Sequence, residues 1–419
     1  MRLFITLLQR GTSITMKKFS LSALSEKTNV IIANYVSLTF YGYFSIGLTL
    51  AVLPIFIHVQ LGYNTIIAGA VISVQYIMTL FMRAYAGNIV DRRGPKPAVI
   101  TSMLCFILAG ILLIVSFLTY HNPGLSLTIL IFSRLLTGCG EGMVGASPVN
   151  WAMLHVGEKH TATAISYNGI ANYSSLAIGA PLGIWMSISL GNWSIGALTI
   201  LIGLIGLGSA FLKPALQGYH DDTGKSFLEV FKSVSPYGAG LALAGIGFGT
   251  LSTFITLYYA YQHWDQAASC ITAFSVLFIV GRLFFASAIN KYGGIKVSIV
   301  CLTVESLGML VLWLATSSDQ ALFGAALTGL GFSLVFPALG VEAVSRVQAS
   351  NKGAALGAYG VFIDISLGIT GPLVGFVAKS FGMEYIFPFS MVMVLMGLVV
   401  CTVLKVKAGK VVKEDVSLY

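Results

Sequence analysis

Twelve long apolar segments, separated by short polar stretches, restrict the fold of this chain more than any other feature. A helix needs about 20 apolar residues to cross roughly 30 Å of hydrocarbon, and lipid admits only helices and closed barrels as spanning structures. The expected spans are residues 30–58, 65–90, 98–119, 126–151, 161–190, 193–212, 236–262, 267–289, 296–316, 320–345, 353–378 and 385–404. The pattern therefore predicts an all-α membrane protein with twelve transmembrane helices.

Composition supports this prediction and indicates an orientation. Of the 419 residues, 56% are hydrophobic and 9% are charged, whereas soluble domains carry about 25% charged residues. Threading the spans from a cytoplasmic N-terminus places nearly all Lys and Arg in cytoplasmic segments, as the positive-inside rule requires. The exceptions are Lys379, outside, and Arg83, Arg134 and Arg282, within the spans. The net charge of +9 therefore reflects topology, and no nucleic-acid partner is expected.

The sequence features that could indicate a metal site, a disulfide, a phosphate-binding loop or a signal peptide do not fit the patterns these require. The five cysteines lie in or beside apolar spans, without the paired spacing of a metal site or disulfide, so neither a metal nor a cofactor is predicted. Residues 218–226 imitate a phosphate-binding loop, but five residues rather than four separate the glycines and no strand precedes them. Residues 1–18 have a short apolar stretch without a cleavage site, so no signal peptide is expected.

The chain is duplicated. Residues 83–94 and 282–293 share an arginine in an apolar run, then a carboxylate or amide, a basic residue and a glycine. Pro181 and Pro372 also match, and each is expected to kink its helix because proline removes a backbone hydrogen bond. The predicted divisions are a cytoplasmic N-terminal segment (1–29), two pseudo-symmetric six-helix bundles (30–212 and 236–404), a cytoplasmic linker between them (213–235) and a cytoplasmic tail (405–419).

Three motifs resemble those of the major facilitator superfamily. They are a loop motif with Gly87, Asp91, Arg92 and Gly94, a helix motif with Arg134, Gly138 and Gly140, and a proline-glycine motif at 179–183, which departs from the pattern at Ala180. Residues 336–342 are most similar to the YhhS/YfcJ-like branch of bacterial inner-membrane transporters. The resemblance implies a central cavity lined by helices 1, 4, 7 and 10, and an interface between the bundles formed by helices 2, 5, 8 and 11.

Ionisable residues inside a bilayer are costly and call for a partner or a function. Glu141 and Asp364 are the two mid-membrane carboxylates on helices expected to meet water, and with Arg134 they are the candidates for proton coupling. Arg134 and Glu141 share a helix face but are too far apart to pair directly, so both are expected to face the cavity. Asp364 and Arg83 lack partners in their own halves. The resemblance implies that helix two packs near helix eleven, so a contact between them across the interface is expected.

Other charged residues favour structural roles. Arg282 and Glu305 lie at similar depths on helices eight and nine, which predicts a structural ion pair. Gly87, Asp91, Arg92, Gly94 and Arg83 are expected to form a gate, with the carboxylate of Asp91 facing a helix N-terminus. The candidates for lining the substrate cavity are Tyr41, Asn172, Tyr173, Tyr258 and Phe332.

These features predict a secondary active transporter that moves a small amphiphilic molecule across the bacterial inner membrane by alternating access, with proton-coupled efflux favoured. An uncoupled facilitator and a proton-symport importer remain alternatives. A membrane-embedded enzyme using Glu141 or Asp364 as an acid or base is a less favoured alternative from another class. The expected partners are the lipid bilayer, the substrate and protons, without an obligate protein partner.

Overall fold

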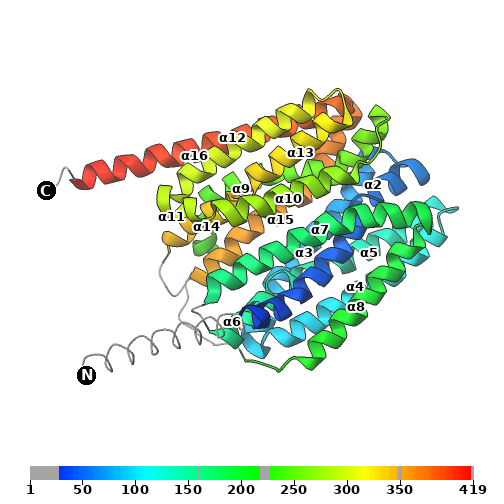
Figure 1. The fold of residues 1–419 in the computed structure, drawn as a ribbon, viewed down its shortest axis with the longest axis horizontal. Helices are drawn as coiled ribbons and strands as arrows, with labels where there is room; N and C mark the ends of the chain where they lie inside the picture. Colours follow the sequence, from blue (N-terminus) through cyan, green and yellow to red (C-terminus); the bar gives the residue numbers. More distant parts are fainter. Residues whose placement is uncertain (1–27, 158–159, 218–226, 348–351, 417–419) are drawn as a thin grey trace, which may run out of the picture.

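The computed structural model describes residues 28–157, 160–217, 227–347 and 352–416, and within these ranges it is helical with no β-strand. The helices form two bundles that lie side by side, with α2 to α8 in one and α9 to α16 in the other (Figure 1). The all-α membrane architecture predicted from the apolar segments is therefore confirmed.

The first half begins with a helix over residues 28–50, which continues through two short elements. The elements that follow are α2 (Leu53–Ile55), the π-helix η1 (Phe56–Gln60), α3 (Thr65–Arg93), α4 (Pro95–Leu118), α5 (Pro123–Val144), α6 (Ser147–Val156), α7 (Thr161–Ser189) and α8 (Trp193–Leu212). Helix α4 packs against both α5 and α8. Glycines such as Gly110 and Gly196 lie at the α4–α8 contact, where an added Cβ would approach the opposite backbone within 3 Å, so these helices pack closely.

The second half repeats this arrangement. Its elements are α9 (Phe227–Gln262), α10 (Ala268–Phe285), α11 (Ser287–Tyr292), α12 (Gly294–Trp313), α13 (Ser318–Phe332), α14 (Val335–Ser345), α15 (Lys352–Ser380), η4 (Met383–Tyr385) and α16 (Ile386–Val416). Helix α9 begins at Phe227, so the last part of the predicted linker extends the first helix of this half. Likewise, α16 runs past residue 404 into the predicted tail.

Eleven helical segments of the described residues are long and apolar enough to cross a membrane. Two of them combine α5 with α6 and α13 with α14. Helix α7 has 29 residues and is long enough to span, but it is not among the eleven. Its first half carries Asn168, Asn172 and several tyrosine and serine residues, which lower its hydropathy. The span at α7, and with it the count of twelve, stays a prediction.

The fourth and tenth spans are each interrupted at corresponding places, between α5 and α6 and between α13 and α14. An interruption leaves backbone carbonyls without helical partners. Side chains from neighbouring helices bind them: Asn168 Nδ2 donates to the carbonyl of Gly145 at 3.2 Å, and Arg282 Nε donates to the carbonyl of Ser333 at 3.1 Å. The two breaks are therefore stabilised by polar side chains of α7 and α10.

The halves meet through two helix pairs, α3 with α15 and α7 with α10. These are spans two, eleven, five and eight, so the expected interface helices are confirmed. We call the end of the bundle that carries Gly94 and residues 213–217 the linker end, and the other end the far end. In Figure 1 the linker end, with α6, α11 and α14, lies to the left and α2 lies toward the far end.

At the far end α3 and α15 touch backbone to backbone. A Cβ added at Gly69 would collide with the carbonyl of Gly371, and one added at Gly375 would lie 2.7 Å from the carbonyl of Thr65. The Thr65 hydroxyl donates to the carbonyl of Gly375 at 3.0 Å. At the linker end, by contrast, Gly87 of α3 and Gly360 of α15 have open space around the position of a Cβ. The two helices therefore touch backbone to backbone at the far end, whereas these two glycines nearer the linker end make no such contact.

Candidate functional site

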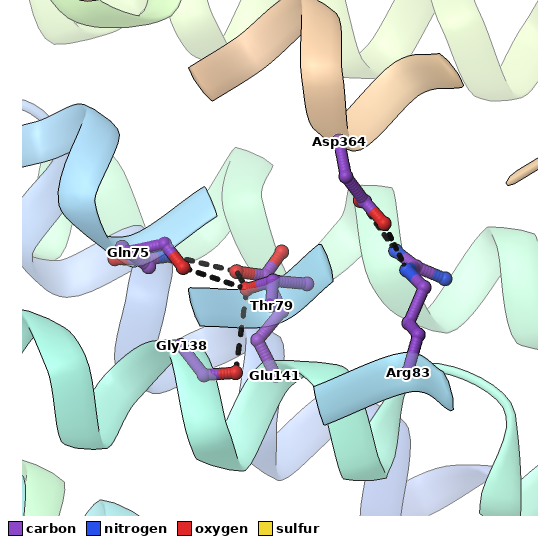
Figure 2. A network of polar contacts seen from close by, with 6 residues as sticks. All are labelled: Gln75, Thr79, Arg83, Gly138, Glu141 and Asp364. Atoms are coloured by element: carbon purple, nitrogen blue, oxygen red, sulfur yellow. Dashed lines mark hydrogen bonds and ion pairs between the residues drawn. The ribbon is translucent and has the colours of Figure 1, made fainter. Parts of the chain in front are cut away.

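One face of α3 carries three polar side chains, Gln75, Thr79 and Arg83, spaced four residues apart. This spacing places them along the same side of a helix. Gln75 and Thr79 face α5 of the same half, and Arg83 faces α15 of the other half (Figure 2). Helix α3 therefore connects the charged interior of the first half to the interface between the halves.

Gln75 bridges the two charged residues of α5. Its Oε1 accepts a hydrogen bond of 2.9 Å from Arg134 Nη1, and its Nε2 donates one of 2.8 Å to Glu141 Oε2. One carboxamide thus satisfies a cation with its oxygen and a carboxyl group with its nitrogen. Arg134 and Glu141 do not pair directly, as their spacing predicts, but the amide links them.

Further hydroxyl groups complete this network. Thr79 Oγ1 lies 3.0 Å from Glu141 Oε2, and Arg134 Nη1 donates to Thr49 Oγ1 at 3.2 Å. Arg134 is 3% exposed and Glu141 is 5% exposed, so both are removed from solvent. Buried charged groups are tolerated when hydrogen bonds satisfy them, which is the role of Gln75, Thr79 and Thr49 here.

Arg134 also borders a small pocket between the first helix, α3 and α5. The residues that line it are Ile46, Thr49, Leu50, Leu53, Ile72, Gln75, Tyr76 and Arg134. The Nε of Arg134 is buried and has no hydrogen-bond partner among the described residues. Arg134 therefore borders this pocket, whereas Glu141 is not among its lining residues; that the two residues face a central substrate cavity stays a prediction.

Arg83 and Asp364 form an ion pair between the halves. Arg83 Nη2 donates to Asp364 Oδ1 at 2.9 Å, and the Arg83 Nε contacts the other carboxylate oxygen. Two parallel contacts of this kind are the strong, directional geometry of an arginine–carboxylate pair. Asp364 is 2% exposed and the Arg83 side chain is 27% exposed. The contact predicted from the missing partners of these two residues is confirmed.

The predicted ion pair between Arg282 and Glu305 is wrong. Both oxygens of Glu305 lack a hydrogen-bond partner among the described residues, and Arg282 Nε instead donates to the carbonyl of Ser333. The Arg282 guanidinium lies 4.8 Å from the ring centroid of Phe278. Helix α13 packs against both α10 and α12, so it stands between the two residues. Equal depth in the membrane did not bring the two side chains together, because Arg282 instead binds the carbonyl of Ser333 at the helix break.

Residues of the predicted gate lie where α3 ends. Gly94 has a φ of 81°, and an added Cβ would collide with the carbonyl of Leu216. Lys96 Nζ donates to the carbonyls of Phe211 at 2.9 Å and Lys213 at 2.6 Å, so the start of the linker is bound to this turn. Arg92 is exposed, and the side chain of Asp91 lies outside the described part of the structure. The gating role of these residues is untested.

Lys213 anchors the same segment from the other side. Its Nζ donates to Asn34 Oδ1 at 2.9 Å and to Ser209 Oγ at 3.0 Å, and it lies 5.5 Å from the centroid of the Tyr35 ring. Burial lowers the pKa of this ammonium group, because desolvation disfavours the charged form. These contacts hold residues 211–216 against the first half.

The equivalent turn of the second half is capped differently. Gly293 has a φ of 85°, and the Oε1 of Glu342, from α14, accepts a hydrogen bond of 2.9 Å from the backbone N–H of Gly294. A carboxylate at this position stabilises the N-terminus of α12. Glu342 lies within the stretch used for the family resemblance, but no role was predicted for it.

The predicted cavity residues separate into two groups. Tyr173 and Phe332 belong to an aromatic cluster in which Tyr173 stacks on Phe278, 3.5 Å between ring centroids, and Phe332 stacks on Phe248 at 5.8 Å. Tyr173 comes from the first half and the other rings from the second, so this cluster crosses the interface.

The remaining three residues lie apart from this cluster. Tyr258 accepts a hydrogen bond of 3.1 Å from Gln262 and packs edge-on against Phe387, with 4.8 Å between ring centroids. Tyr41 faces Gly206 of α8, and the carbonyl of Asn172 accepts from Ser175. No residue of this group has a tested role in substrate binding.

Pro181 and Pro372 both lie inside their helices, α7 and α15. Each is flanked by glycines at close contacts: Gly179 approaches Gly47 of the first helix, and Gly371 approaches Gly69 of α3. The sequence motif around each proline therefore coincides with a place where two backbones touch. The predicted kinks stay predictions.

Comparison with known proteins agrees with this architecture. The family model described as Major Facilitator Superfamily matches residues 35–270 and 238–416. A protein of Pseudomonas aeruginosa named an uncharacterized MFS-type transporter is 50% identical over 376 residues, which cover 89% of this chain and 93% of that protein. A Burkholderia pseudomallei protein with the same description is 47% identical over 377 residues, covering 90% of this chain and 92% of its own.

Solved structures show the same fold at low identity. The crystal structure of a variant of the nucleoside transporter NupG matches with a TM-score of 0.70 and 14% identity, over 89% of this chain and 99% of that one. The human organic anion transporter TETRAN matches with a TM-score of 0.60 and 14% identity over the same fractions. The relatives and the fold identify a transporter rather than an enzyme, so the enzymatic alternative is set aside. With two pseudo-symmetric helical halves, an ion pair between them and a family model that matches most of its length, the chain belongs to the major facilitator superfamily.

Proposed function

We propose that this transporter couples proton movement to the transport of a small amphiphilic molecule by alternating access. The observation that carries the proposal is the ion pair between Arg83 and Asp364, which joins the halves through the same helix that holds the Gln75–Glu141 bond. A carboxylate that pairs across two moving bodies changes its environment when they separate. That change is what a proton-coupled transporter requires.

The asymmetry of the interface supports alternating access. Helices α3 and α15 touch at Gly69 and Gly371 but leave open space around Gly87 and Gly360. Rocking one half against the other, about the region of the ion pair, would open the contact at Gly69 and Gly371 and close the space beside Gly87 and Gly360. Helical bundles move in this way because packed interfaces have discrete arrangements.

Protonation acts differently on the two carboxyl groups. A proton on Asp364 removes the negative charge that holds Arg83, which weakens the link between the halves. A proton on Glu141 removes the charge to which Gln75 and Thr79 donate, which loosens the bond between α3 and α5. We assign Asp364 to sensing the motion and Glu141, with Arg134, to proton exchange beside the pocket. Asp91, Gly87, Arg92 and Gly94 would then form the gate at the end of α3.

We propose that the protein lies in the bacterial inner membrane with both termini in the cytoplasm, and that it exports its substrate. The basic residues gathered near the linker end support this orientation. The proline-glycine motif of α7 departs from the family pattern at Ala180, which weakens its support for export. An uncoupled facilitator and a proton-symport importer are the alternatives that experiment must separate.

Everted membrane vesicles with a pre-formed pH gradient provide the test. A panel of small amphiphilic compounds is added, and a compound that collapses the gradient only in vesicles containing the transporter is taken as the probe. In reconstituted vesicles, Glu141→Gln and Asp364→Asn should abolish proton-driven accumulation of this probe while passive exchange persists. If both variants still accumulate the probe against its gradient, the proton-coupling proposal fails. If the wild-type protein only equilibrates it, the facilitator is the correct function.

A further inference from the structure

Glu305 is the most isolated ionisable group among the described residues. It lies in the middle of α12, it is 0% exposed, and neither carboxyl oxygen has a hydrogen-bond partner in the described part of the chain. Its Oε1 would lie 2.6 Å from a Cβ added at Gly247 of α9, and its backbone touches Gly331 of α13. A buried carboxyl group without any partner calls for a specific explanation.

The first half shows that packing alone does not require a carboxyl group here. Phe106 of α4 lies between Gly42 of the first helix and Gly140 of α5, in contact with the Cβ position of each. These three residues correspond, in the duplicated sequence, to Glu305 with its two glycines. A phenyl ring fills the space in the first half, whereas an acid occupies it in the second.

The surroundings of Glu305 are apolar. Its neighbours near Gly247 are Met309 and Val394, and the titratable group closest to it along α12 is the thiol of Cys301, one turn away. Arg282 lies beyond α13 and donates to Ser333. The other charged residues with described side chains on α12 and on the helices packed on it each lie roughly 13 Å or more away along a helix axis: Glu229, Lys232, Lys291, Lys296, Asp319, Glu342, Glu384, Lys405 and Lys407.

A carboxylate anion cannot persist in such a site, because an unpaired charge without water or hydrogen bonds is strongly disfavoured. The group must therefore carry a proton while the helices are packed as described. We propose that Glu305 is a proton-binding site of the second half, filled when α9, α12 and α13 are in contact. Its proton can leave only when α9 or α13 moves away from α12 and water reaches the carboxyl group.

The part of Glu305 in transport rests on the proposed function, since it would supply a third proton site besides Glu141 and Asp364. The geometry differs from theirs: Glu141 and Asp364 are held by hydrogen bonds to named partners, whereas Glu305 has none. Release of its proton would therefore report movement within the second half rather than separation of the two halves.

Infrared spectroscopy of the full-length protein in lipid nanodiscs tests the charge state directly. At neutral pH the wild type should show a band of a protonated carboxyl group that shifts in heavy water and that is missing from Glu305→Phe. This variant copies Phe106 and should fold for the same reason, and Glu305→Gln serves as the second variant if it does not. Glu384→Gln, which removes an exposed carboxyl group, is the matched control and should retain the band.

Two results overturn the proposal. If wild type and both Glu305 variants give the same carboxyl bands from mildly acidic to mildly alkaline pH, Glu305 does not hold a proton. If the band is lost but the number of protons moved per probe molecule is unchanged in vesicles, its part in transport is wrong. Absence of proton-driven flux in the wild type would instead count against the proposed function, and the infrared result would still decide the proton site.

Discussion

Arg83 and Asp364 lie 281 residues apart in the chain, yet Arg83 Nη2 and Asp364 Oδ1 are 2.9 Å apart. Neither has the partner that the duplication could have supplied in its own half, because Phe106 stands at the position that matches Glu305 and Tyr173 at the position that matches Asp364. The ion pair therefore exists only in the assembled two-half structure. It links the conformation of the interface to the charge of one carboxylate.

Replacing Asp364 with Asn should shift the protein toward the conformation in which α3 and α15 separate further. A hydrogen bond to a charged group contributes about 2 kcal/mol, equivalent to a change of about thirtyfold in a conformational equilibrium. Spin labels on the linker ends of α3 and α15 measure the separation. The charge exchange Arg83→Asp with Asp364→Arg should restore part of the wild-type distance distribution. An unchanged distribution in Asp364→Asn would show that the ion pair does not hold α3 and α15 together.

Gln75→Leu should destabilise the first half, because Arg134 and Glu141 each lose their bond to the amide and keep only a hydroxyl contact, with Thr49 and Thr79 respectively, in a buried site. The expected loss is about 2 to 4 kcal/mol, as for other buried polar groups deprived of partners. Thermal unfolding in detergent measures it. Ser73→Ala is the control, since the Ser73 hydroxyl is buried without a partner, and it should change the melting temperature little. Equal effects of the two substitutions would exclude a bridging role for Gln75.

Gly371→Ala should hinder closure at the far end, since an added Cβ there would meet the carbonyl of Gly69. Both atoms belong to regions of rigid helix, so the contact cannot relax by a side-chain rotation. Accessibility of single cysteines placed at the far end of α3 should rise. Gly360→Ala, on the same helix but facing open space, should leave that accessibility unchanged; a similar rise in both variants would contradict the steric explanation.

A double-mutant cycle separates the ion pair that forms from the one that does not. Arg282→Gln and Glu305→Gln should combine additively, within about 0.5 kcal/mol, because the residues do not touch. Arg83→Gln and Asp364→Asn should instead show a coupling energy of about 1 to 3 kcal/mol. Unfolding free energies measured in the same detergent compare the cycles. Strong coupling between Arg282 and Glu305 would show that the two side chains meet.

The helices could be located from the sequence because apolar length is visible in it. The interface pairs followed from the family resemblance, and together with the missing partners of Arg83 and Asp364 they gave the contact between these two residues. Sequence reasoning failed for Arg282 and Glu305 because depth in the membrane says nothing about which helix stands between two residues. Gln75 and Thr79 were missed for a different reason: a search for charges overlooks neutral side chains. Their spacing with Arg83 on α3 is the signal that could have found them.

The contact of Gly69 with Gly371 is made of main-chain atoms, and the bond from Thr65 to the Gly375 carbonyl adds one hydroxyl group. Nothing at this contact takes up or releases a proton, and none of these groups carries charge. Acidification on that side of the membrane therefore cannot open this helix contact by protonating one of its groups. The energy that opens it has to arrive mechanically, through the length of α3 and α15.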